Sequence, residues 1–127
     1  MDFSNYLSSA LINATVRGVA YVPPAKVWVS LYTTDPTKDD TGREVEGSTY
    51  SRLQVTMKQP FDGVSTNENL MQWNTATTEW GTITHVAIHD SETGGNMLYY
   101  TPLEVPKNIE VGDQFQITVD NLKLTLS

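Results

Sequence analysis

Residues 80–100 constrain the fold more than any other segment, because they read as two β-strands joined by one turn. Residues 84–89 alternate between two faces, with the two-residue period of a half-buried strand. One face would carry Thr84, Val86 and Ile88, and the other His85, Ala87 and His89. The alternation stops at residues 90–96, where Gly94 and Gly95 supply the backbone freedom that a reversing loop needs. The pattern predicts a β-hairpin.

Several further segments show the same two-residue period and predict additional short strands. They are residues 27–32, 53–57, 70–73, 115–119 and 122–126, separated by polar or glycine-containing stretches such as the long polar loop at residues 34–47. The strand at residues 27–32 has apolar residues on both faces, which predicts a central or covered position. No helices alternate with these strands, so we expect an all-β fold, an antiparallel β-sandwich of about seven short strands.

The first 18 residues have a different, helical period. Phe3, Leu7, Leu11 and Ala14 are spaced by fours and threes and would form one stripe of an amphipathic helix. Ser4 is placed to cap its start, and Gly18 is placed to end it. The stripe would either pack on its own domain or dock onto a neighbouring subunit. In the second case Phe3, Leu7 and Leu11 are the candidate attachment residues.

A chain of 127 residues has the size of one domain. We therefore expect a single domain over residues 1–127, with the helix in residues 1–18 and the β-sandwich in residues 25–127. The chain has no cysteine, which excludes disulfides and thiolate metal sites. Its net charge of −7 and its scattered basic residues argue against nucleic acid as a partner. It shows neither a signal-peptide pattern nor an apolar run of membrane-spanning length, so we expect no membrane contact.

Three patterns resemble chemical sites, and none is complete. Residues 35–46 place oxygen-bearing side chains as in a calcium-binding EF-hand loop, but Asp40 stands where that loop needs glycine, and the flanks predict strands. His85 and His89 would lie about 13 Å apart on a strand and could not share a metal ion. The adjacent His89, Asp90 and Ser91 cannot converge as a hydrolase triad, and nothing brings Asp39 close to Asp90 as paired carboxylates. We therefore expect no enzyme activity, no metal and no cofactor.

Aromatic residues are frequent in or near the predicted strands, and most of them are expected in the core. Trp28 and Tyr32 would share one strand face, because their positions in the strand differ by an even number. Exposure of that face would offer flat rings for stacking against a sugar or against another subunit. Coverage of the face would remove this glycan-binding hypothesis.

Several of these segments together resemble a family of small bacteriophage virion proteins, often labelled tail-fibre-like, with a short helix followed by a β-domain. The resemblance is carried by residues 5–7, 29–37, 44–45, 50–52, 80–85 and 94–99. Two departures are Asn74, where family members have proline, and Ala87, where they commonly have glycine. Both positions concern strand edges, and the fold is expected to tolerate them.

The resemblance implies a non-enzymatic structural protein of the virion, made in the host cytoplasm without a signal peptide. We expect a tail-, collar- or fibre-associated appendage subunit that assembles as a homo-oligomer, for which a trimer is suggested by analogy, and that contacts other virion proteins. Two alternatives stay open at this point. The chain would otherwise be a capsid decoration (cement) protein, or a module of the adsorption apparatus that binds a host surface glycan.

Overall fold

The computed structural model describes residues 1–126, so Ser127, the last residue of the predicted domain, lies outside the described residues. One helix, α1 (Asn5–Val16), is accompanied in this range by nine strands. The strands are β1 (Asp2–Phe3), β2 (Val27–Tyr32), β3 (Leu53–Val55), β4 (Val64–Thr66), β5 (Met71–Gln72), β6 (Gly81–His89), β7 (Met97–Ile109), β8 (Gln116–Ile117) and β9 (Lys123–Thr125). The predicted all-β chain with an N-terminal helix is confirmed.

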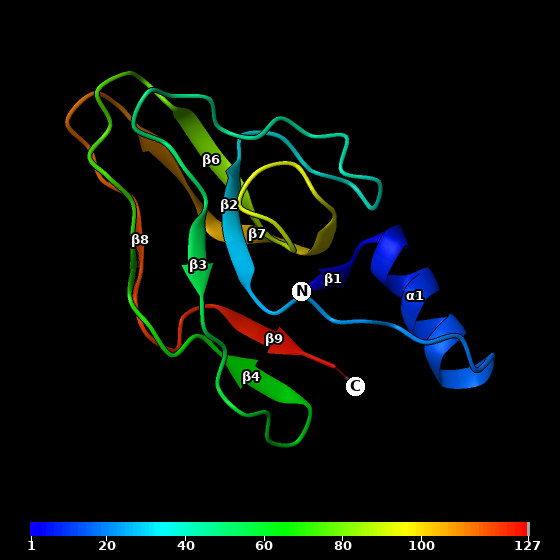
Figure 1. The fold of residues 1–127 in the computed structure, drawn as a ribbon. Coiled ribbons are helices and arrows are strands. Elements are labelled where there is room, and N and C mark those ends of the chain that lie inside the picture. The colour runs from blue at the N-terminus through cyan, green and yellow to red at the C-terminus, as the bar shows by residue number, and fades with distance from the viewer. Residues whose placement is uncertain (127) are drawn as a thin grey trace.

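Five of the strands form one antiparallel sheet in the order β1-β7-β6-β2-β3 (Figure 1). The predicted hairpin is its centre, because β6 and β7 pair along most of their length around the loop at residues 90–96. β2 lies between β6 and β3, which confirms the predicted covered strand. The other strands form two-stranded antiparallel sheets, β4 with β9 and β5 with β8.

The main hydrophobic core lies against one face of the five-stranded sheet. Val29 and Leu31 of β2 are opposite Ile88 and Val86 of β6, and all four side chains are buried. Side chains of β5, β8 and the residues next to these strands belong to the same core. Among them, Trp73 follows β5, Phe115 precedes β8, and their rings meet edge to face with ring centres 5.4 Å apart. Burial of this apolar surface is the main stabilising term available to a chain without disulfides.

The opposite face of the sheet carries Ser30, Tyr32, Ala87 and His89, and it is covered by residues 34–44 and by the N-terminal segment. Figure 1 shows α1 to one side of the strands, connected to them by β1 before it and by residues 17–26 after it. This placement leaves α1 in contact with β7 along one side.

Three details differ from the prediction. Phe3 belongs to β1 and pairs with Tyr99, so it precedes α1 and is no part of the helical stripe. β7 continues to Ile109, well past the predicted end of the hairpin, because an irregularity between Ile83 and His85 of β6 accommodates extra residues of β7. β4 was not predicted. The helix itself begins after Ser4 and ends before Gly18, as the caps predicted.

Candidate functional site

The start of α1 is fixed by hydrogen bonds to two distant segments. The Ser4 amide donates to the carbonyl of Leu98 in β7 (2.9 Å), and the Asn5 amide donates to the carbonyl of Lys38 (2.9 Å). The Asn5 side chain also donates to a carboxylate oxygen of Asp39 (2.7 Å). Within the helix, the Ser4 hydroxyl accepts from the amide of Leu7 (3.1 Å), which is a standard N-cap. The loop at residues 34–47 and strand β7 therefore position the helix together.

The inner side of α1 packs on the chain itself. Leu7 is 3 % exposed, whereas Leu11 and Ala14 on the same stripe are half-buried. The Phe3 ring packs edge to face on Tyr99, with ring centres 5.2 Å apart. The structure thus places the three predicted attachment residues, Phe3, Leu7 and Leu11, on the side of the N-terminal segment that faces its own β-strands.

The outer side of the N-terminal segment is apolar and exposed. Ile12 is 58 % exposed and Val16 is 76 % exposed, and the connection after the helix exposes Val19 and Val22. Between Phe3 and Ala25 the single charged residue is Arg17. A helix on the surface of a soluble domain usually carries charged residues on its outer side. This surface therefore has the composition of a contact site.

A buried polar cluster holds the loop at residues 34–47, the same loop that bonds to the start of α1. His89 is fully buried, and its Nδ1 lies 2.8 Å from the Ser30 hydroxyl. Its Nε2 lies 3.3 Å from a carboxylate oxygen of Asp40 and 3.3 Å from the Tyr32 hydroxyl. The Tyr32 hydroxyl donates to the other Asp40 oxygen at 2.5 Å. Asp40, whose side chain makes these contacts with Tyr32 and His89, has a left-handed backbone conformation (φ 56°).

Ser30, His89 and Asp40 are the residue types of a hydrolase triad, here drawn from three separate segments. In a triad the serine bonds to Nε2 of the histidine and the carboxylate to Nδ1, whereas in this cluster the two nitrogens have the opposite partners. Ser30 and His89 are both 0 % exposed, so a substrate could not reach either group. The arrangement holds the loop in place and presents no accessible nucleophile.

A second polar cluster lies beside the first and ties three segments together. Arg52 makes a two-pronged ion pair with Glu44, with both nitrogen–oxygen distances at 2.9 Å. The same guanidinium donates to the carbonyls of Ser91 (2.9 Å) and Gly94 (2.7 Å) in the hairpin loop. Tyr50 donates to Glu44 (2.6 Å) and accepts from the amide of Leu31 (3.0 Å). Arg52 therefore connects the hairpin loop to the loop at residues 34–47.

Burial and charge set the protonation states of these groups. Burial opposes the ionisation of Glu44, but the hydrogen bonds from Arg52 and Tyr50 outweigh it and keep the pKa of Glu44 below its ordinary value. Burial lowers the pKa of His89, as does the Arg52 charge, against the opposing effect of Asp40. Burial and the Asp40 hydrogen bond raise the pKa of Tyr32. At neutral pH the first cluster therefore contains the neutral His89 imidazole and the protonated Tyr32 phenol, and the second contains the Glu44–Arg52 carboxylate–guanidinium pair.

The remaining sequence candidates are dispersed. Tyr32 is 2 % exposed and Trp28 is half-buried, so this pair does not form an open aromatic face. Asp35 accepts from the amide of Thr37 (2.9 Å) and starts a turn, while Asp39 bonds to the helix and Asp40 to Tyr32. The carboxylates of the EF-hand-like stretch thus have separate structural roles, and the part of the chain that the structure describes contains no group of three His, Asp or Glu side chains able to hold a metal ion.

Sequence reasoning missed both polar clusters, since each depends on residues far apart in the chain. A weak signal existed in Ser30, a polar residue between Val29 and Leu31 in a strand that was predicted to be covered. A buried hydroxyl needs a partner, but the sequence did not indicate which one.

No helix within residues 1–126 has the length and apolar character needed to span a membrane.

A search of curated proteins finds no match to the chain. A family described as podophage GP4 fiber I protein gp80 matches residues 2–125, which is nearly the whole chain. The small tail-fibre-like virion family that the sequence resembles is thereby confirmed, and the chain belongs to the family of the podophage GP4 fiber I protein gp80.

Proposed function

We propose that this bacteriophage fibre protein is a non-enzymatic, fibre-associated subunit of the virion that works as a symmetric homo-oligomer. The family match supports a structural role in a phage fibre. The observation that carries the proposal further is the exposed N-terminal segment, in which Ile12, Val16 and Val22 meet no other part of the chain's core. Exposed apolar surface of this kind is typical of contacts between proteins.

The β-strands form the rigid body of this subunit, and the N-terminal segment provides its contact with other chains. The Arg52 and His89 clusters fix the loops of this body, and the loop at residues 34–47 and β7 bond to the start of α1, so the body presents α1 in a fixed position. Attachment by a short N-terminal element leaves the rest of the surface free to face solvent.

Electron microscopy of the intact particle tests the location. We expect density for this chain in a small number of symmetric copies at the tail, where a fibre belongs. An antibody against the chain should label the same place, and particles produced without the chain should lose both signals. Hundreds of copies distributed over the capsid would instead identify a decoration protein and contradict the proposal.

A deletion of residues 1–18 is a poor test of attachment, because it also removes β1, the N-cap Ser4 and the buried Leu7. Full-length Ile12→Gln is sharper, since Ile12 is exposed and makes no core contact. Particles carrying Ile12→Gln should contain fewer copies of the chain than the original particles. Val111→Gln, at an exposed valine on the β-body, is the matched control and should leave the copy number unchanged.

A further inference from the structure

One stripe of α1 is exposed to solvent along its whole length, and its first residue, Asn5, also bonds to Asp39 of the same chain. We call this stripe the outer face of α1, and it consists of Asn5, Ser9, Ile12 and Val16, spaced by fours and threes. All four side chains are exposed. The stripe lies opposite Leu7 and Ala14, which face β7. The small Ser9 beside Ile12 and Val16 would let another helix approach closely.

The outer face is also uncharged, which matters for a chain with a net charge of −7. Copies of such a chain repel one another except where the approaching surfaces carry little charge. No Asp, Glu, Lys or Arg occurs from Phe3 to Val16. α1 packs on its own chain along one side only, so burial of its other side against a second surface would stabilise it further. The outer face of a second copy carries no charged residue, and it offers a surface on which α1 can pack.

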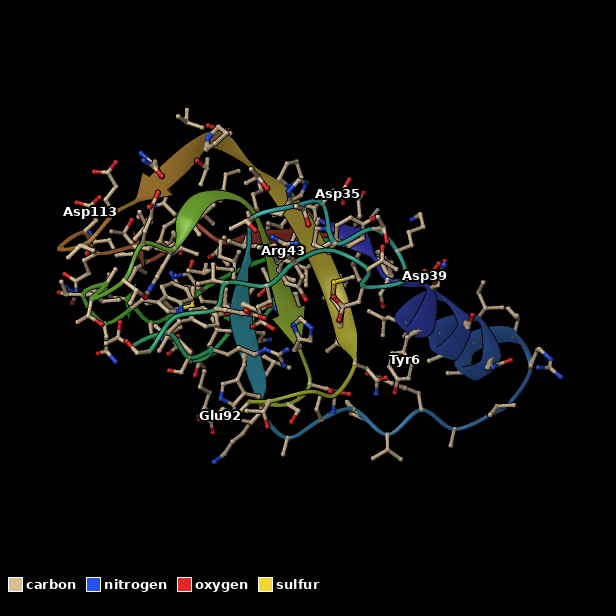
Figure 2. The ribbon with its side chains drawn as sticks, turned by 90° about the horizontal axis from the view of Figure 1, so that it is seen from above. Tyr6, Asp35, Asp39, Arg43, Glu92 and Asp113 are labelled. Carbon is tan, nitrogen blue, oxygen red and sulfur yellow. The ribbon has the colours of Figure 1, made fainter. Side chains whose placement is uncertain are left out.

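The two ends of α1 carry opposite charge. Arg17 follows the helix and its guanidinium bonds to the neutral amide of Asn13 (2.6 Å). At the other end, Asp2 precedes the helix and Asp39 is bonded to Asn5, while Lys38 offsets part of their charge. Figure 2 shows the labelled Asp39 beside the start of α1. The helix is about 18 Å long, so the opposite charges are well separated within one copy.

We propose that two copies of this chain associate through the outer faces of α1, packed antiparallel about a two-fold axis. This arrangement brings Arg17 of each copy to the acidic end of the other helix, whereas a parallel arrangement would place Arg17 beside Arg17. Opposed helix dipoles favour the same orientation. The inference deepens the proposed homo-oligomer by naming its contact surface and its partner, and it rests on that proposal.

Light scattering during size-exclusion chromatography of the purified full chain tests the association. We expect a mass of twice 14.1 kDa at high micromolar concentration, falling to 14.1 kDa for Val16→Glu. Val111→Glu is the matched control, because Val111 is 67 % exposed and Val16 is 76 % exposed, and it should keep the doubled mass. Circular dichroism should show unchanged folding in both variants. A monomer for the unaltered chain, or an equal effect of both substitutions, would overturn the proposal.

Disulfide cross-linking tests the orientation, and the chain is suited to it because it has no cysteine. In the antiparallel pair Val16 of one copy lies near Asn5 of the other. Val16→Cys mixed with Asn5→Cys should therefore form a mixed disulfide, and Val16→Cys alone should cross-link at least 10-fold more slowly, a margin of about 1.4 kcal/mol. Rapid cross-linking of Val16→Cys to itself, or a trimer in light scattering, would overturn the antiparallel pair.

These measurements use the purified chain and do not depend on the particle. If the chain remains a monomer while microscopy finds it at the tail fibre, the contact surface is wrong and the fibre location stands. If the chain dimerises but is absent from the tail, the proposed location is wrong and the contact surface stands.

Discussion

The loop at residues 34–47 lies between two regions, the His89 and Arg52 clusters on one side and α1 on the other. The first region buries polar side chains that have hydrogen-bond partners, whereas the second leaves apolar side chains exposed. Beneath the loop, His89 and Arg52 are buried and each has several hydrogen-bond partners from distant segments. Beyond the loop, α1 buries Leu7 and leaves Ile12 and Val16 in solvent. Asp39 and Asp40, adjacent in sequence, bond to the two sides, Asp39 to Asn5 and Asp40 to Tyr32.

This contrast separates two uses of polar and apolar residues. Buried polar groups with fixed partners specify one arrangement of the loops, because any other arrangement leaves a group unsatisfied. Exposed apolar groups do not specify the fold of their own chain, and burial by another chain would stabilise them. Variants on the first side should therefore change stability, and variants on the second should change association.

The largest effect is expected for Arg52→Met. The substitution keeps the volume but leaves the Glu44 carboxylate without its ion pair and removes two hydrogen bonds to the hairpin loop. Loss of one member of a largely buried pair should lower the free energy of unfolding by about 3 kcal/mol. Urea denaturation followed by tryptophan fluorescence measures this. Arg43→Met, at an exposed arginine, is the control and should change it by less than about 0.5 kcal/mol.

Two adjacent glycines in the hairpin loop give a smaller, paired prediction. Gly94 and Gly95 both have positive φ, so alanine at either one adopts an unfavourable conformation. A Cβ at Gly94 would meet nothing within 4 Å, whereas at Gly95 it would lie 2.4 Å from a carboxylate oxygen of Asp90 and 2.6 Å from the Ser91 Cβ. Gly94→Ala should cost about 1 kcal/mol and Gly95→Ala about 2–3 kcal/mol. Equal costs in urea denaturation would show that the loop relaxes freely.

The His89 cluster predicts a pH dependence. Because burial lowers the pKa of His89 in the folded chain, the unfolded chain takes up a proton first as the pH falls. Stability should therefore decrease below the ordinary histidine pKa of about 6.5 and stop decreasing on this account once the folded-state pKa is passed. The lowered pKa of Glu44 continues the loss at more acidic pH.

Urea midpoints measured between pH 8 and pH 4 would show this dependence, and His89→Gln should remove its first part. His85→Gln, which leaves the buried His89 ring in place, is the matched control. A variant without His89 that retains the full slope near neutral pH would disprove the assignment to this cluster.

The smallest effect on stability is expected on the other side of the loop. Ile12→Gln changes a side chain that is 58 % exposed and outside the core clusters. The free energy of unfolding, measured at low micromolar concentration, should change by less than about 0.5 kcal/mol. A cost of 2 kcal/mol or more, as expected for a core side chain, would show that the outer face already packs within its own chain.

Local signals in the sequence predicted a large part of the fold. β2 and β6 were recognisable from their two-residue period, and α1 because Ser4 and Gly18 act within one turn of the helix. β1 could not be recognised, since two residues have no period and their partners are Tyr99 and Tyr100. The far part of β7 contains Pro102 and Pro106, which conceal a strand from pattern analysis.

The polar clusters could not be predicted for the same reason as β1. The contact between Ser30 and His89 requires the exact register of β2 against β6, in which Ser30 is opposite Ala87. The contact with Asp40 further requires the left-handed turn of the loop. The outer face of α1 was within reach of the sequence, because the absence of charged residues from Phe3 to Val16 is visible there.

The short pairing of β1 with the middle of β7 sets an order of events during synthesis. The N-terminal segment is made before its partners Leu98, Tyr99 and Tyr100, which follow it by more than 90 residues. Contacts between residues this far apart in sequence form late. The helix therefore reaches its fixed position only after the hairpin exists, so a chain that stops before Leu98 lacks the β7 partners that hold α1 in place.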